Sequence, residues 1–133
     1  MPTFDDSATT TAPVEEVWKL LYDTSRMGEW WEGVERIDGS GHDGKGDITL
    51  YPDGYPDFPM PQELRAAPDG RGLTISCLVS YLVFEWRLHP LDPGTRISVH
   101  VEIPEEEAHR LESQRGGVSA SLRSLAALAT ATA

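Results

Sequence analysis

The residues best suited to chemistry are spread through the sequence without a recognised catalytic or metal-binding spacing. The four histidines, His42, His89, His100 and His109, lack the separations typical of metal sites. Cys77 is the single cysteine, and without an identifiable His or Asp partner its default interpretation is a small buried apolar residue. No glycine-rich phosphate loop or serine nucleophile elbow is present. The sequence therefore predicts no metal and no cofactor, and it leaves any catalytic residue unknown.

Asp6 is the carboxylate whose role depends most on how its strand is oriented. It falls in register with Phe4 and Ala8, so an inward-facing strand would bury it and make it a candidate for proton transfer. We favour the alternative, in which this strand is a sheet edge and Asp6 is solvated. Glu85 and Arg87 alternate with apolar neighbours, and we expect them to form an exposed ion pair worth about 0–1 kcal/mol.

The segment 51–61 combines four prolines with side chains that are too apolar for an ordinary surface loop. These side chains are Tyr51, Tyr55, Phe58 and Met60. Two interpretations compete, a lid over a cavity and a contact surface for another subunit, which would allow a homodimer. The lid is the slightly favoured interpretation.

Composition and charge restrict the class of partner. The formal net charge of −11 argues against nucleic acids and anionic membranes as partners. No apolar run reaches the roughly 18 residues of a membrane helix, and residues 1–11 lack the features of a signal peptide, so we expect a cytoplasmic protein. The length of 133 residues fits one domain over 1–133. The absence of Asn and the excess of Arg over Lys are typical of a high-GC bacterial genome.

Hydrophobic periodicity predicts an α+β protein. Pro13 suits the first position of a helix over 14–21, and a second short helix is expected over 27–31. Turns rich in Pro, Asp and Gly then separate short strands, of which 95–103 shows the clearest alternation. The expected strands are 3–11, 34–39, 46–51, 60–66, 72–80, 82–89 and 95–103.

A long helix is expected to begin at Pro104 and to carry an apolar stripe toward the sheet. Gly116 and Gly117 interrupt it, at a cost of about 1 kcal/mol each relative to Ala. Either a kink or the close approach of another backbone would account for the pair. Because strands joined by short turns pair antiparallel, the expected architecture is a curved antiparallel sheet wrapped around this helix.

The opening of the chain resembles a known superfamily. The segments 12–18 (APVEEVW) and 23–31 (DTSRMGEWW), together with the turn 94–97 (GTRI), resemble the START and birch-pollen-allergen superfamily, and its polyketide cyclase/dehydrase and lipid-transport branch in particular. The resemblance extends over the whole chain in element order. It implies a helix-grip fold with a deep hydrophobic pocket under the C-terminal helix, in a fold that serves carriers, sensors, cyclases and hydrolases alike.

Three functions follow from this architecture. The first is binding of a small hydrophobic molecule, as a carrier or sensor, against which an interior without a pocket above roughly 300 Å³ would count. The second is a polyketide cyclase or aromatase, which needs a deep polar group such as Tyr51 or Asp6. The third is a protein-interaction module using segment 51–61. Candidate ligand-binding residues come from three sources: the inward alternation of the elements, the segment 51–61, and the adjacent Trp30 and Trp31, one of which is expected at the pocket mouth. They are Trp31, Tyr51, Tyr55, Phe58, Met60, Ile75, Cys77, Phe84, Trp86, Val99 and Leu122.

Overall fold

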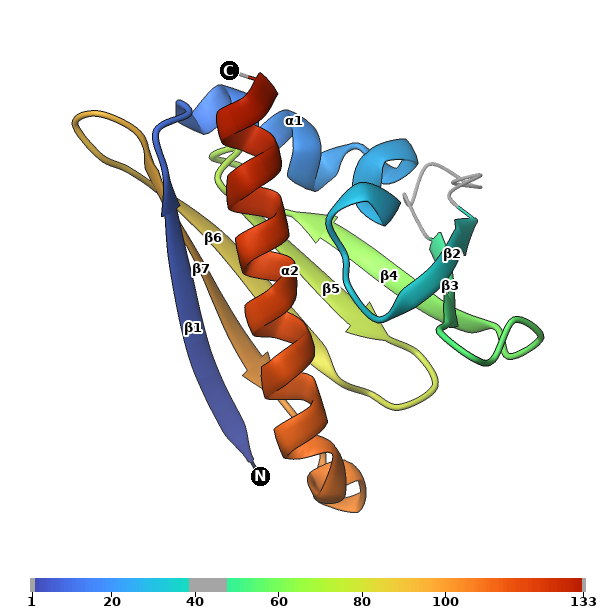
Figure 1. The fold of residues 1–133 in the computed structure, drawn as a ribbon. Helices are drawn as coiled ribbons and strands as arrows, with labels where there is room; N and C mark the ends of the chain where they lie inside the picture. The colour runs from blue at the N-terminus through green and yellow to red at the C-terminus, as the bar shows by residue number, and fades with distance from the viewer. Residues whose placement is uncertain (1, 39–47, 133) are drawn as a thin grey trace.

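The computed structural model describes residues 2–38 and 48–132. Within them lie seven strands, two α-helices and two 3₁₀ helices, the latter labelled η (Figure 1). In chain order they are β1 (Thr3–Thr10), α1 (Val14–Tyr22), η1 (Thr24–Glu29), β2 (Val34–Asp38), β3 (Ile48–Pro52), β4 (Met60–Ala66), β5 (Gly72–Cys77), β6 (Val83–Pro90), β7 (Thr95–Glu102), η3 (Glu105–Arg110) and α2 (Leu111–Thr132).

The seven strands form one antiparallel sheet in the order β1-β7-β6-β5-β4-β3-β2. β1 pairs with β7, so the first strand of the chain closes the sheet beside the last, and α2 runs across one face (Figure 1). This arrangement confirms the predicted α+β class and the helix-grip architecture. It also confirms that β1 is an edge strand.

Alternating side chains give the sheet one apolar face. In β7, Thr95, Ile97, Val99 and Val101 are buried, whereas the residues between them are at least partly exposed. The same alternation in β5 and β6 places further large apolar side chains on the face that α2 covers. Burial of apolar surface at about 25 cal/mol per Å² is the main term that holds α2 against this face.

The strand predicted over 72–80 ends earlier, at Cys77. The chain turns there because the Tyr81 N–H donates to the Cys77 carbonyl oxygen at 3.0 Å, and Tyr81 itself has a φ of 62°. Val79, expected to face inward, is therefore 45% exposed. Part of the strand predicted over 46–51 lies outside the described residues.

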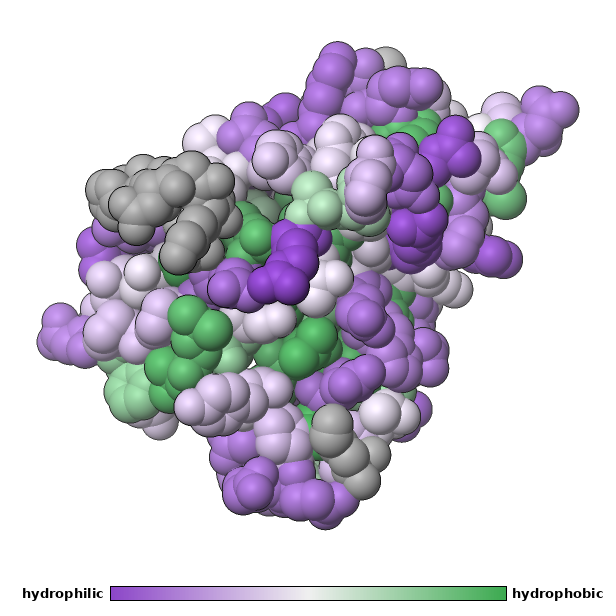
Figure 2. All heavy atoms as spheres, turned by 180° about the vertical axis from the view of Figure 1, so that it is seen from behind, coloured by the Kyte–Doolittle hydropathy of each residue, from purple (hydrophilic) through white to green (hydrophobic). Residues whose placement is uncertain are grey.

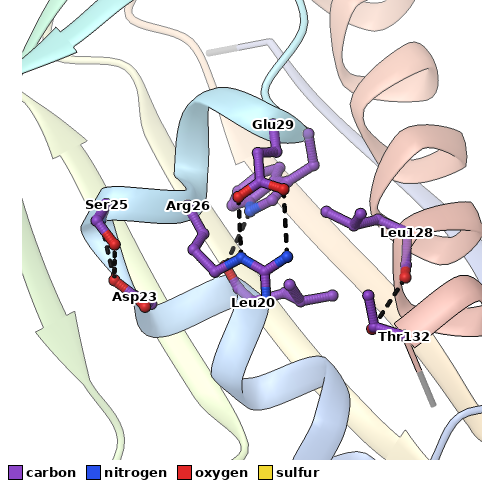
Figure 3. Close-up of polar contacts among 8 residues, drawn as sticks. Leu20, Asp23, Ser25, Arg26, Glu29, Leu128 and Thr132 are labelled. Carbon is purple, nitrogen blue, oxygen red and sulfur yellow. Dashed lines mark hydrogen bonds and ion pairs between the residues drawn. The ribbon is translucent and has the colours of Figure 1, made fainter.

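The short helix expected at 27–31 is the 3₁₀ helix η1, which begins three residues earlier and ends two residues earlier in the chain. Asp23 Oδ1 accepts hydrogen bonds from the Ser25 N–H and hydroxyl, and Arg26 meets the Glu29 carboxylate through two nitrogens, at 2.9 and 3.2 Å (Figure 3). Trp30 follows η1, is fully buried, and donates its indole N–H to the Leu20 carbonyl oxygen at 2.9 Å. This anchoring fixes the position of its neighbour Trp31.

The C-terminal helix differs from expectation in two ways. Pro104 opens the 3₁₀ helix η3, and the α-helix begins only at Leu111. Gly116 and Gly117 produce neither a break in the helix nor a close backbone approach, because α2 is continuous and a Cβ at either position would meet nothing within 4 Å. None of the helices formed by the described residues combines the length and hydropathy that crossing a bilayer requires.

The turn before β7 packs directly on the end of β1. Gly94 has a φ of 98°, and a Cβ there would overlap the carbonyl oxygen of Thr10. Gly70 has a comparable φ of 69°, but a Cβ there would meet open space. The two glycines share the left-handed conformation and differ in the neighbouring backbone.

We predict that Gly94→Ala destabilises the fold more than Gly70→Ala does. The left-handed conformation alone costs about 1–2 kcal/mol at each site, and the clash with the β1 backbone adds at least about 2 kcal/mol at Gly94. Urea denaturation followed by circular dichroism measures both values. Equal losses for the two variants would show that the end of β1 yields to the added methyl group.

A candidate ligand pocket between the sheet and α2

α2 does not cover the inner face of the sheet evenly. Its most extensive approach to the sheet is at β1, one edge of the sheet (Figure 1). Toward the other edge, a pocket of about 210 Å³ lies between α2 and residues of β3 to β6. The void inferred from the mismatch between one straight helix and a twisted sheet is therefore present. Its volume lies below the roughly 300 Å³ set for the first hypothesis, which counts against a carrier or sensor of large molecules.

One stripe of α2 forms the roof of the pocket. Gln114, Gly117, Val118 and Ser121 line it, and their spacing places them on a single helical face. Gly117 supplies no side chain at the centre of this stripe, and nothing else fills the position its Cβ would occupy. The glycine thus keeps part of the pocket open.

Apolar and aromatic side chains form much of the floor. Leu50, Met60, Leu82, Phe84 and Trp86 all contribute from the strands and the turn before β6. Trp31 lies beside them, with its ring edge-to-face to Phe84 at a centroid distance of 6.1 Å.

The pocket aromatics are continuous with the aromatic core. Trp31 stacks on the buried Trp30 at a centroid distance of 5.8 Å, and Trp30 meets Trp86 edge-to-face at 5.2 Å. The prediction that one of the two adjacent tryptophans is core and the other borders the pocket therefore agrees with their positions.

Within the described residues, two side chains of the lining carry a buried polar atom without a hydrogen-bond partner. Gln62 donates its side-chain N–H to the Met60 carbonyl oxygen at 3.1 Å, but its Oε1 accepts nothing. The indole N–H of Trp86 is also unpaired. The two side chains are only 1% and 3% exposed. Leaving such groups unpaired costs about 1–3 kcal/mol each, so both atoms lower the stability of this part of the protein.

Cys77 lies in the same lining, opposite Gln62 in the β4–β5 pairing. The Ser80 backbone N–H donates to the thiol sulfur at 3.4 Å. Burial raises the pKa of the thiol, but hydrogen bonds from Ser80, Val79 and Gln62 together outweigh it, so the net pKa lies below that of an ordinary cysteine. A polar corner therefore interrupts the apolar floor.

Hydrogen bonds tie the segment that follows η1 to the roof. The Glu32 N–H donates to the Ser121 hydroxyl at 2.9 Å, and the Ser124 hydroxyl donates to the Glu32 carboxylate at 3.2 Å. Glu32 and Arg110 also belong to the lining. Charged groups thus stand beside the apolar interior, as expected where a pocket meets solvent.

The structure brings five of the predicted binding residues together. Trp31, Met60, Cys77, Phe84 and Trp86 line the pocket. Ile75, Val99 and Leu122 face inward but are packed in the core, at most 2% exposed, and lie outside the lining. Alternation identifies the inner face of a strand, but it cannot tell which inner residues α2 covers.

The remaining predicted residues lie away from the pocket. Tyr51 alternates with the buried Leu50, so it faces outward, where the Arg36 guanidinium stacks over its ring at 3.9 Å. Tyr55 and Phe58 are 66% and 51% exposed. Only the ends of segment 51–61 reach the pocket, so the segment does not form the expected lid.

Asp6, the other candidate for proton transfer, is also outside the pocket. It is partly exposed on the edge strand β1, where its carboxylate accepts the Ser7 N–H. This placement agrees with the favoured interpretation of Asp6 as a solvated residue.

Sequence reasoning missed several lining residues. Gln62 lies at an inward position of β4 between Met60 and Leu64, and a polar residue in that register is a signal that a pocket or a buried network is nearby. Ser121 and Gly117 interrupt the apolar stripe of α2 in the same way. Ser80 carried no such signal, because its place depends on the turn that ends β5.

The outer face of the sheet is mostly hydrophilic, with separate hydrophobic patches (Figure 2). A depression of about 340 Å³ there holds His100, Glu85 and Arg87 among its lining residues. The predicted Glu85–Arg87 pair is wrong, because Arg87 pairs instead with Asp69 from the β4–β5 turn. This depression has a larger volume than the inner pocket, and its lining mixes charged residues with apolar ones such as Leu73 and Val99.

His100 lies close to carboxylates from three strands. Its Nδ1 lies 2.8 Å from Asp5 Oδ1 on β1, and its Nε2 lies 3.5 Å from the Glu102 carboxylate on β7. Among the described residues, Glu85 of β6, His100 and Glu102 also bring possible ligand atoms within 4.8 Å of one another, but the group is partly exposed and such acidic groups are common without a cation. The Asp5 hydrogen bond raises the pKa of His100.

The model of the family described as polyketide cyclase/dehydrase and lipid transport matches residues 1–130. The chain belongs to this family. No functionally curated protein is detectably similar to it in sequence.

Solved structures share the fold at low sequence identity. The Zhui aromatase/cyclase from a Streptomyces species has a TM-score of 0.81 at 18% identity, over 96% of this chain and 93% of that one. The di-domain aromatase/cyclase BexL from the BE-7585A biosynthetic pathway has a TM-score of 0.78 at 14% identity, over 95% of this chain but only 45% of BexL. Ara h 8.0201 has a TM-score of 0.64 at 14% identity, over 98% of both chains. At these low identities, the similarities show that this protein shares the fold of those structures.

We predict that His100 makes the stability of the protein depend on pH. Because its pKa is raised in the folded state, its contribution is fully present below its unfolded pKa and is lost as pH rises through the folded value. Urea titrations across the neutral range should show the difference in unfolding free energy between wild type and His100→Gln shrinking as pH rises. A constant difference would show that the cross-strand pair with Asp5 does not favour the protonated ring.

We also predict that Gly116→Ala and Gly117→Ala each stabilise the protein by about 1 kcal/mol, because alanine favours the helix and neither methyl group meets a neighbour. Thermal and urea denaturation measure the gain. Gly116, on the exposed side of α2, is the control for Gly117. A loss of stability at Gly117 alone would mean that the roof lies closer to the floor than the pocket implies.

Proposed function

We propose that the protein binds a small, mainly apolar organic molecule in the pocket between β3–β6 and α2, as a carrier or sensor. The observation that carries this proposal is the pocket of about 210 Å³ beneath α2, whose largely apolar lining includes several aromatic rings. The apolar part of a ligand would contact Phe84 and the other aromatic rings of the lining. Family membership supports the same interpretation.

The size of the pocket restricts the ligand. At about 210 Å³ it is smaller than the roughly 300–1,000 Å³ of pockets that enclose drug-sized molecules. A molecule of one or two rings, or a short chain, is therefore favoured over a multi-ring polyketide. The small volume counts against a carrier of large lipids.

A cyclase or dehydratase-like enzyme is the second candidate. The aromatase/cyclase structures that share the fold favour it, and so does the polar corner of the pocket, where Cys77 and Ser80 are within reach of a bound molecule. These residues replace Tyr51 and Asp6, which lie outside the pocket. Conversion of a polyketide-like substrate by the purified protein, lost in Cys77→Ala, would favour catalysis over binding alone.

The two glycines of α2 provide the test of binding. Gly117→Leu should place an isobutyl group in the pocket and weaken binding of α-naphthol at least about tenfold, or about 1.4 kcal/mol. Gly116→Leu adds the same group on the exposed side of the helix and should leave the affinity unchanged. Isothermal titration calorimetry measures both.

The control is the thermal stability of each variant, which shows that both are folded. Equal weakening by the two leucines, or no binding of α-naphthol, octanol or a similar small apolar probe to the wild type, would overturn the proposed function.

A further inference from the structure

We propose that Arg110 selects ligands with a negatively charged end, so that the pocket takes a small carboxylic acid in its ionised form. The inference rests on the proposed function, since the acid must enter the same pocket. It adds the chemical class of the polar group and the end of the pocket at which that group binds.

Two charged side chains belong to the pocket. Among the described residues that line it, Arg110 is the basic one and Glu32 the acidic one. The chain as a whole has 22 acidic residues and 11 basic ones, so its composition does not favour a positive charge at this place. Each of the two side chains therefore has to be considered as a partner for a ligand.

The two charges lie at opposite ends of the roof. Arg110 ends η3 and directly precedes Leu111, the first residue of α2. The Glu32 carboxylate accepts a hydrogen bond from the Ser124 hydroxyl at 3.2 Å, and an α-helix rises about 20 Å between Leu111 and Ser124. Charges in contact with solvent are screened over about 8 Å at physiological salt. Glu32 therefore does not cancel the charge of Arg110.

The fold accounts for Glu32 without a ligand. Its N–H donates to the Ser121 hydroxyl at 2.9 Å and its carboxylate accepts from Ser124, so it fastens the segment after η1 to α2. Arg110 has no comparable structural task. Its Nη1 donates to the Glu107 carboxylate at 3.1 Å, and both side chains of this pair are 28% exposed. Partly exposed pairs of this kind contribute little to stability, so a ligand is the better explanation for the arginine.

The residues beside Arg110 make this end of the roof polar. Ser113 and Gln114 follow it by three and four positions and line the pocket with it. Gly117 and Val118 continue the same face without a polar side chain, and the floor below them is largely apolar. A ligand with one anionic end and an apolar body matches this order, with its anion at Arg110 and its body over the aromatic rings of the floor.

A carboxylate is the anion that suits an arginine in a pocket of this size. A guanidinium carries several N–H donors in a planar fork, and Glu107 takes only one of the three nitrogens. The remaining donors are available for a two-point contact with a second carboxylate. The volume of about 210 Å³ limits the rest of the ligand to one or two rings or a short chain. Octanoate meets both conditions, and octanol is its neutral counterpart.

The experiment measures the affinity of the full chain for octanoate, octanol and octylamine by isothermal titration calorimetry at neutral pH. Wild type should bind octanoate at least about tenfold more tightly than octanol, because hydrogen bonds to charged groups are stronger than neutral ones. Octylamine should bind more weakly than octanoate. Tightest binding of octylamine would assign the ligand's polar end to Glu32 and overturn the inference.

Arg110→Gln should remove the preference for octanoate and leave the affinity for octanol unchanged. The matched control is Arg115→Gln, which removes the same charge from an exposed residue of α2 outside the lining. Equal weakening of octanoate by the two variants would show that the overall charge of the protein sets the preference. That result would overturn the inference.

Glu107→Gln tests the competition for the guanidinium. Because this change frees Nη1 of Arg110, octanoate should bind more tightly, whereas octanol should bind as before. Glu112→Gln removes the same charge from an exposed residue outside the lining and should have the smaller effect. A gain at Glu107 no larger than the gain at Glu112 would contradict a direct contact between Arg110 and the ligand.

The outcomes separate this inference from the proposed function. If octanol binds the wild type and octanoate binds no more tightly, the inference is overturned and the proposed function stands. If neither α-naphthol nor any of the three eight-carbon probes binds, both fail. Near-ultraviolet circular dichroism of each variant confirms that its tertiary structure is intact.

Discussion

The structure depends on how one helix covers the apolar face of a seven-stranded sheet. α2 approaches the sheet most extensively at β1. α1 packs against α2, η1 and β6, and so adds a second layer beside the long helix. A straight helix and a twisted sheet diverge with distance from their line of contact. The pocket lies in that divergence, and Gly117 widens it where a side chain would otherwise enter.

Buried polar atoms make the pocket costly to maintain. Gln62 and Trp86 belong to its lining, and within the described part of the chain Gln62 Oε1 and the Trp86 indole N–H have no hydrogen-bond partner, so each lowers the stability of the protein. By contrast, the neighbouring Trp30, in the core, donates its N–H to the Leu20 carbonyl oxygen. The indole N–H of tryptophan is thus hydrogen-bonded in the core and unpaired in the pocket lining.

The sequence was enough to predict the order of the elements and the inner face of most strands, because alternation in β6 and β7 is clear. It was not enough to separate pocket from core, since Val99 and Phe84 follow the same pattern and only the position of α2 distinguishes them. The segment around Tyr55 was wrongly expected to form a lid. Its prolines and apolar side chains indicate a stiff loop, but the direction in which the loop points depends on tertiary contacts that the sequence does not show. Gln62 was overlooked, although a polar residue in an inward register is visible in the sequence.

The order of the elements along the chain has a consequence for biosynthesis. A hydrogen bond between the hydroxyls of Thr10 and Thr130, at 2.7 Å, joins β1 to the last turns of α2. All seven strands are translated before α2. On the ribosome, the apolar face of the sheet therefore emerges before the helix that buries it. Chaperone capture of the nascent chain would therefore be concentrated in the interval before the final helix leaves the exit tunnel.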